Sequence, residues 1–152
     1  MAPSRTIVIA GAGIGGLTAS LALAARGFDI IVLERETALQ EVGAGLQLSP
    51  NASRILIELG LEPLLTPRLV APDAVKVMSV RARRPIASIP LQDARQRHGA
   101  PYWLLRRPDL QAALLSKVSE HPRLELRVRA PDEGFTPDAG GVQASWMPVV
   151  EP

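Results

Sequence analysis

The sequence predicts an α/β fold organised around one strand–helix–strand unit near its start. The β-branched run Ile7–Ile9 leads directly into a cluster of glycines, which indicates a short buried strand. Residues 17–26 are good helix formers, and Gly27 is placed to end that helix as a C-cap. Ile30–Leu33 follows as a second buried strand. This order predicts two parallel strands joined by a helical crossover.

The turn between the first strand and the helix carries a dinucleotide fingerprint. Gly11, Gly13 and Gly16 have the spacing G-x-G-x-x-G. They allow, in that order, a tight turn, a close approach of a pyrophosphate and close packing of the helix on the strands. The helix N-terminus offers N–H groups and a positive dipole end to phosphates. Glu34 ends the second strand and can accept hydrogen bonds from ribose hydroxyls. An acid at this position favours FAD or NAD over NADP.

Two other interpretations of residues 6–25 compete with the nucleotide site. The segment carries no charge and contains Gly11-x-x-x-Gly15, a pattern found on the packing face of membrane helices. It also resembles a signal peptide with Arg5 as its basic end. Neither interpretation predicts a second strand that ends in an acid at the required distance, so the nucleotide site is favoured. We therefore expect no membrane partner and a cytoplasmic location.

Composition limits the other classes of site. The 152 residues suffice for one domain, 47% of them are hydrophobic, and the net charge of +2 calls for no nucleic-acid partner. The chain has no cysteine, which excludes disulfides, thiolate metal sites and cysteine nucleophiles. His98 and His121 lie in polar stretches without metal-ligand spacing, so we expect no metal site. The basic cluster Arg81–Arg84 indicates a solvated turn, with a phosphate or nucleic-acid patch as the alternative.

The middle of the chain predicts several further elements by periodicity and capping. They are a strand at Leu46–Leu48, a helix at Asn51–Leu59, a hairpin of Ala74–Val80 with Ile86–Leu91, and a helix at Asp109–Ser119. Residues 61–74 and 93–100 are expected to be connections. Leu124–Val128 alternates and is expected to join the edge of the parallel sheet.

The end of the chain is rich in proline and glycine and lacks a clear period. We therefore divide the sequence into a nucleotide-binding domain over residues 1–130 and an irregular C-terminal tail over residues 131–152. A further strand at Val142–Trp146 is the alternative for part of that tail.

Three stretches in this order resemble the N-terminal part of the FAD-dependent aromatic hydroxylases, the salicylate-hydroxylase-like flavoprotein monooxygenases. They are Gly11–Leu17 with Glu34-Arg35, Glu41–Asn51, and Leu105–Leu110 with its R-x-D-L motif. The resemblance covers about residues 5–128. It implies a Rossmann-like FAD-binding βαβ domain with an inserted β-hairpin region. Members of this family are longer and carry later motifs that are absent here, so a truncated N-terminal portion is expected.

The resemblance implies that ten residues bind FAD. They are Gly11, Gly13, Ile14, Gly15, Gly16, Glu34, Arg35, Gly45, Gln47 and Arg107. Glu34 would hold the ribose with Arg35 beside the adenosine, and the Gly43–Gln47 loop would lie near the flavin. Arg107 would contact FAD, since a guanidinium is a fixed fork of donors for phosphate or ribityl oxygens. No catalytic residue is assigned, because Gln47 stands where some relatives carry a titratable base and glutamine cannot take up a proton.

The resemblance also implies a reaction. NADH or NADPH would reduce FAD, and the reduced flavin would use O₂ to hydroxylate a small aromatic substrate. One alternative is an NAD-dependent oxidoreductase, which explains the fingerprint but neither Gly43–Asn51 nor Arg107–Leu110. The other alternative is a non-catalytic FAD- or NAD-binding fragment. The sequence indicates neither the substrate nor the oligomeric state.

Overall fold

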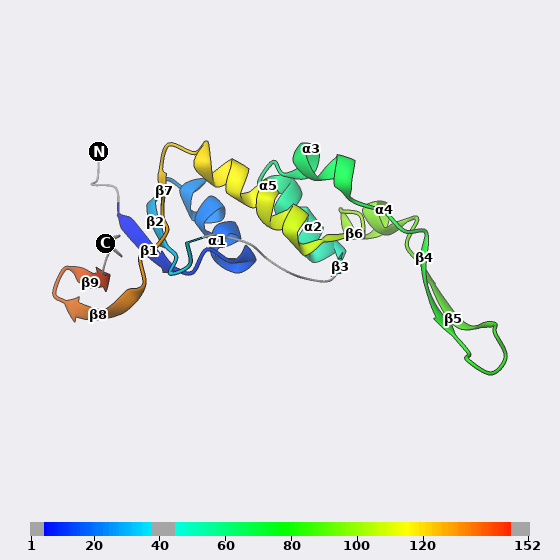
Figure 1. The fold of residues 1–152 in the computed structure, drawn as a ribbon. Helices are drawn as coiled ribbons and strands as arrows, with labels where there is room; N and C mark the ends of the chain where they lie inside the picture. The colour runs from blue at the N-terminus through cyan, green and yellow to red at the C-terminus, as the bar shows by residue number, and fades with distance from the viewer. Residues whose placement is uncertain (1–4, 38–44, 147–152) are drawn as a thin grey trace. The chain divides into compact units, whose positions relative to one another are not determined.

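The computed structural model describes residues 5–37 and 45–146 and arranges the chain in two compact units (Figure 1). The first unit comprises residues 1–41 and 111–152, and the second comprises residues 42–110. The region predicted as one domain over residues 1–130 is divided in this way because its middle part forms strand pairs of its own.

A three-stranded parallel sheet with the order β1–β2–β7 forms the centre of the first unit. β1 (Thr6–Ala10) pairs with β2 (Asp29–Leu33), and β2 pairs with β7 (Leu124–Arg127). Helix α1 (Ile14–Ala24) forms the crossover from β1 to β2 and buries Leu17 completely. The βαβ unit is thus confirmed, as is the strand predicted near residue 124 at the edge of the parallel sheet.

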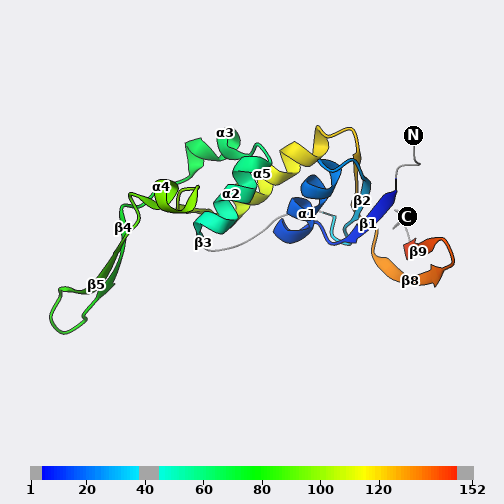
Figure 2. The ribbon, with the colours of Figure 1, turned by 180° about the vertical axis from the view of Figure 1, so that it is seen from behind.

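A β-hairpin stands where an irregular tail was predicted. β8 (Asp132–Asp138) and β9 (Gly141–Trp146) pair antiparallel, so the alternative of a late strand is confirmed and residues 147–152 lie outside the described part. The hairpin and α1 lie on opposite sides of the parallel sheet (Figures 1 and 2). The guanidinium of Arg127 in β7 lies 4.8 Å from the ring centroid of Trp146, a cation–π contact that joins the hairpin to the sheet.

β1 is less buried than its sequence predicts. Within the described residues it pairs with β2 alone, and its side chains alternate between half-buried and exposed. Val8 is 38% exposed and lines a cavity of about 470 Å³ together with Phe135 and Val142 of the hairpin. The apolar run Ile7–Ile9 therefore lies in an edge strand with one open face, and the strand is not buried on both faces.

The second unit consists of short helices and two antiparallel strand pairs. Its elements in chain order are β3 (Gly45–Leu48), α2 (Pro50–Glu58), α3 (Glu62–Leu65), the 3₁₀ helix η1 (Thr66–Arg68), β4 (Ala74–Met78), β5 (Pro85–Pro90), α4 (Ala94–His98) and β6 (Trp103–Arg106). β3 pairs with β6 and β4 pairs with β5, so the predicted hairpin is confirmed. Buried Leu56, Leu61, Leu65, Trp103 and Leu105 form the core of this unit. Helix α5 (Arg107–Ser119) begins in the second unit and ends in the first.

Two segments predicted as connections contain helices. α3 and η1 occupy part of 61–74, because a proline at the first positions of a helix costs no hydrogen bond. α4 occupies part of 93–100 and ends at Gly99, whose φ of 77° lies in the left-handed region. Arg95 of α4 forms a 2.6 Å ion pair with Glu62 of α3.

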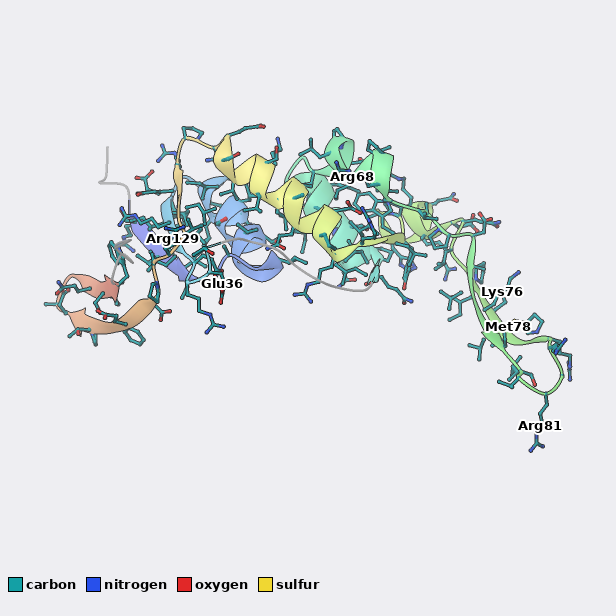
Figure 3. The ribbon with its side chains drawn as sticks, viewed as in Figure 1. Glu36, Arg68, Lys76, Met78, Arg81 and Arg129 are labelled. Atoms are coloured by element: carbon teal, nitrogen blue, oxygen red, sulfur yellow. The ribbon has the colours of Figure 1, made fainter. Side chains whose placement is uncertain are left out.

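The β4–β5 hairpin is exposed along most of its length. Every residue from 80 to 90 is exposed, including the predicted basic turn at Arg81–Arg84. Figure 3 shows Lys76, Met78 and Arg81 spaced along this hairpin. None of the helices in residues 5–37 and 45–146 is long and apolar enough to cross a membrane.

Candidate cofactor-binding site

The glycine turn after β1 is held in a conformation that requires glycine. Gly11 has a φ of 96°, and its N–H donates a 2.7 Å hydrogen bond to the carbonyl oxygen of Leu33 at the end of β2. A Cβ on Gly16 would lie 2.0 Å from the carbonyl oxygen of Gly11 and 3.4 Å from Cγ2 of Ile9. The tight turn and the close helix packing that the sequence predicts for these glycines are therefore present.

The N-terminus of α1 follows this turn with free space around its glycines. Gly13 is the N-cap residue, with extended backbone and no side-chain capping hydrogen bond, and Ile14 begins the helix. A Cβ on Gly13 or Gly15 would meet no heavy atom within 4 Å. Open space thus lies beside the first helical turn, whose backbone N–H groups and positive dipole end are the features that an anion site uses.

Glu34 holds the glycine turn from the adjacent strand. Its Oε2 accepts a 2.8 Å hydrogen bond from the N–H of Ala12, and its Oε1 accepts a 3.0 Å bond from the N–H of Glu36. Each carboxylate oxygen has two acceptor positions, so the carboxylate retains capacity for the hydroxyls of a ribose. Sequence reasoning predicted the ribose role but missed the bond to the turn.

The loop after β2 is fixed to the segment after β7. The N–H of Arg129 donates a 3.4 Å hydrogen bond to the carbonyl oxygen of Glu36, and both residues lie in one region of the first unit in Figure 3. Arg129 has a φ of 55°, which is unusual for a residue with a side chain. Arg35 is exposed and forms a 3.4 Å ion pair with Glu36. The carboxyl ends of β1, β2 and β7 thus meet at one edge of the sheet, where nucleotides bind in open α/β folds.

The β3–β6 strand pair carries the predicted site residues of the second unit. Gln47 lies in β3, and its Oε1 accepts a 2.9 Å hydrogen bond from the Tyr102 hydroxyl. Gly45 lies opposite Arg106 in the register of the pair. Arg107 begins α5 and is exposed. Gly43, part of the loop predicted near the flavin, lies outside the described residues.

A buried carboxylate holds two arginines beside this strand pair. Asp109 is 6% exposed, and its oxygens accept hydrogen bonds of 2.7 and 3.0 Å from Nε and Nη2 of Arg106. Nη1 of Arg68 lies 3.8 Å from Oδ1 of the same carboxylate. The hydrogen bond from Arg106 lowers the pKa of Asp109, against desolvation, and the charge of Arg68 adds to that effect. Sequence reasoning missed this cluster, although Asp109 belongs to the R-x-D-L motif.

The predicted site residues therefore fall into two groups, one in each unit. The first unit brings together Gly11, Gly13, Ile14, Gly15, Gly16, Glu34 and Arg35. The second unit contains Gly45, Gln47 and Arg107. Among residues 5–37 and 45–146, no cluster of His, Asp and Glu side chains could hold a metal ion. The donor set consists of backbone N–H groups and arginines, which suits the phosphates and ribose of a dinucleotide.

The comparison with protein families identifies the nucleotide. A family model described as "FAD binding domain" matches residues 4–149. The chain belongs to this FAD-binding family. The match extends past residue 128, where the resemblance in the sequence ends, and takes in the β8–β9 hairpin.

Curated relatives of the chain are FAD-dependent aromatic monooxygenases. It is 40% identical over 127 residues to 3-hydroxybenzoate 6-hydroxylase 1 of Aquipseudomonas alcaligenes, covering 83% of this chain and 32% of that protein. It is 44% identical over 111 residues to 3-amino-4-hydroxybenzoate 2-monooxygenase of Streptomyces cremeus, covering 72% of this chain and 28% of that protein. The chain thus spans about a third of the length of these relatives.

Solved structures share the fold. The chain matches p-nitrophenol 4-monooxygenase PnpA from Pseudomonas putida DLL-E4 with a TM-score of 0.76 and 21% identity, over 92% of this chain and 39% of that one. It matches the tetrameric form of 2-methyl-3-hydroxypyridine-5-carboxylic acid oxygenase with a TM-score of 0.75 and 23% identity, over 94% of this chain and 38% of that one. The α/β fold predicted from the sequence is therefore confirmed.

Proposed function

We propose that this chain is the FAD-binding portion of a flavin-dependent monooxygenase that hydroxylates a small aromatic acid with NADH or NADPH and O₂. The observation that carries the proposal is the uncapped N-terminus of α1 behind a glycine turn that Glu34 holds in place. This arrangement lies inside a family match to FAD-binding domains over nearly the whole chain.

The residues of the first unit would hold the adenosine diphosphate half of FAD. The backbone N–H groups in the uncapped first turn of α1 would suit the pyrophosphate, which would approach past Gly13, where a Cβ meets no heavy atom within 4 Å. The Glu34 carboxylate would accept hydrogen bonds from the ribose hydroxyls, and Arg35, which is exposed, would lie beside the adenosine. We assign the affinity for FAD mainly to this half of the site.

The residues of the second unit would act at the flavin end. Gly45 and Gln47 present an open strand face, and Arg107 supplies a guanidinium for phosphate or ribityl oxygens. Bound FAD supplies the electron transfer from the nicotinamide and the reaction with O₂. Gln47 cannot act as a base, so its amide orients the substrate and does not take its proton.

The names of the relatives support the substrate class. 3-Hydroxybenzoate and 3-amino-4-hydroxybenzoate, which the names of the two relatives contain, are hydroxylated aromatic carboxylates. We extend this substrate class to the present chain. We also propose that the protein acts in the cytoplasm, where NADH and NADPH are available as reductants.

The experiment that tests the proposal combines reconstitution with product analysis. The purified chain is mixed with FAD, and oxidation of NADH or NADPH is followed with and without 3-hydroxybenzoate. Mass spectrometry then detects oxygen incorporation into the aromatic ring. Substrate-stimulated oxidation with a hydroxylated product supports the proposal. FAD binding without product identifies a non-catalytic FAD-binding chain, and a folded chain without FAD binding contradicts the proposal altogether.

A further inference from the structure

A pocket of about 400 Å³ opens on the second unit beside the β3–β6 pair. The residues that determine its chemistry are Gly45, Gln47, Arg68, Val70, Leu104 and Arg106. Val70 extends the strand pair on its other edge, because its N–H and carbonyl groups exchange hydrogen bonds of 2.7 and 2.8 Å with those of Leu104. Gly45 stands opposite Arg106 in the register and has no side chain to fill the space.

Two arginines line this pocket, and the guanidinium groups of both lie near the carboxylate of Asp109. Arg68 and Arg106 are exposed, whereas Asp109 between them is buried and engaged by hydrogen bonds. Two positive charges stand against one negative charge, so the pocket keeps an excess positive charge. The two-point bond between Arg106 and Asp109 holds that guanidinium in one orientation, which reduces the ordering cost of binding an anion.

The third polar group of the pocket is also oriented as a donor. Because Oε1 of Gln47 accepts the hydroxyl hydrogen of Tyr102, the amide group offers its N–H hydrogens to a ligand. The polar side chains that line the pocket are therefore donors. The aliphatic side chains of Val70 and Leu104 supply an apolar wall beside them. Val70 is 60% exposed, so that wall is open to a ligand.

We propose that this pocket binds the aromatic acid substrate, with Arg68 and Arg106 as the residues that select its carboxylate. The inference rests on the proposed function, because it names the part of the chain that recognises that substrate. A carboxylate pairs with guanidinium and amide donors, and the attached ring lies on the apolar wall. The volume of the pocket falls within the range of small-molecule sites. The apolar wall favours an aromatic carboxylate over the phosphate of a nicotinamide cofactor, because a phosphate group needs hydrogen-bond donors on all sides.

The test titrates the full 152-residue chain with 3-hydroxybenzoate by calorimetry. Arg106→Gln and Arg68→Gln each remove one guanidinium, and Arg68→Gln leaves the Arg106–Asp109 pair in place. Arg54→Gln is the matched control, since Arg54 is an exposed arginine of the second unit outside this pocket. 3-Hydroxybenzyl alcohol, which keeps the ring and lacks the charge, is titrated in parallel. Circular dichroism verifies that each variant folds.

We expect both pocket variants to bind 3-hydroxybenzoate about tenfold more weakly than the wild type, as for loss of one charged hydrogen-bond partner. The Arg54→Gln variant should bind 3-hydroxybenzoate as the wild type does. The affinity for 3-hydroxybenzyl alcohol should be the same in the wild type and in both pocket variants. Equal affinity of the wild type and both variants for 3-hydroxybenzoate, or no binding at all, overturns the proposal. Displacement by equimolar inorganic phosphate also overturns it and assigns a phosphate site. A parallel titration with FAD separates the substrate-pocket proposal from the proposed FAD-binding function. If the chain binds FAD but the 3-hydroxybenzoate titration gives a contrary result, only the assignment of this pocket is wrong.

Discussion

The Glu34 carboxylate accepts a 2.8 Å hydrogen bond from the backbone N–H of Ala12. The acid that directly follows β2 therefore fixes the turn that follows β1. Because the same carboxylate also accepts from the N–H of Glu36, it joins the two loops at the carboxyl edge of the sheet. The turn is thus set for a ligand by the residue that is itself expected to contact that ligand.

Glu34→Gln should weaken FAD binding through both roles. An amide keeps one oxygen acceptor, so one of the two backbone hydrogen bonds is lost together with the charge. Hydrogen bonds to charged groups contribute about 1.5–3 kcal/mol, which corresponds to at least a tenfold higher dissociation constant. Quenching of flavin fluorescence measures the dissociation constant of each protein for FAD. Glu36→Gln is the control, because within the described residues the Glu36 side chain forms an ion pair with exposed Arg35 at the surface.

Binding of 2′,3′-dideoxy-ADP separates the two roles of Glu34. This nucleotide lacks the hydroxyls that the carboxylate would contact. If Glu34 also positions the turn, Glu34→Gln still weakens its binding. If the wild type and Glu34→Gln bind 2′,3′-dideoxy-ADP with equal affinity, contact with the ribose is the only role of Glu34 in binding.

Gly16→Ala should destabilise the first unit, whereas Gly15→Ala should not. The added methyl group at Gly16 would lie 2.0 Å from a backbone oxygen, so the turn or the helix must shift. Overpacking of this kind costs about 1–3 kcal/mol. The Gly15 position is open, and alanine is the better helix former by about 1 kcal/mol. Urea denaturation followed by circular dichroism compares the two, and similar midpoints would contradict the tight packing at Gly16.

The Asp109 carboxylate should stabilise the chain in a pH-dependent way. Its pKa is lowered first of all by the hydrogen bond from Arg106. A lowered pKa in the folded state means that the stabilisation is complete above the ordinary value of about 3.9 and is lost as the pH falls through the folded-state pKa. The difference in stability between the wild type and Asp109→Asn should therefore shrink below about pH 4. Urea denaturation at several pH values measures this difference in stability. Asp93→Asn is the control, because Asp93 is exposed. A difference between the wild type and Asp109→Asn that does not change with pH would contradict the prediction.

Arg107 should contribute to FAD affinity by its fork of donors. Arg107→Lys keeps the charge and loses the planar fork, and Arg107→Ala loses both. We therefore expect dissociation constants that rise from the wild type to the lysine variant and again to the alanine variant. Arg97→Ala in α4 is an exposed arginine that serves as control. If alanine and lysine at position 107 bind FAD like the wild type, Arg107 is a solvated residue at the start of α5.

The βαβ unit was predictable because each of its signals is local. The φ of Gly11, the close packing at Gly16 and the acid after β2 follow from spacing within about thirty residues of chain. The hairpin at residues 74–90 was predictable for the same reason, since alternation and an intervening turn lie side by side.

The features that the sequence did not reveal depend on tertiary context or on weak local signals. The contact of Arg68 with Asp109 joins residues far apart in the chain, and no spacing rule predicts it. α4 buries only Ala94 among its five residues, so it has no apolar stripe, although Gly99 and the basic residues before it are helix-ending signals. The exposure of Val8 follows from the position of β1 at the edge of the sheet, which an apolar run does not encode.

Titration of the chain with FAD, beside Gly13→Val, tests the central claim most directly. A Cβ at Gly13 meets no heavy atom within 4 Å and the backbone there is extended, so we expect the variant to fold, and its melting curve beside that of the wild type verifies this. It should nevertheless block the approach of the pyrophosphate to the backbone. The account predicts saturable quenching of flavin fluorescence by the wild type and at least tenfold weaker binding by folded Gly13→Val. Equal FAD affinity of the two folded proteins, or no FAD binding by the folded wild type, would contradict it.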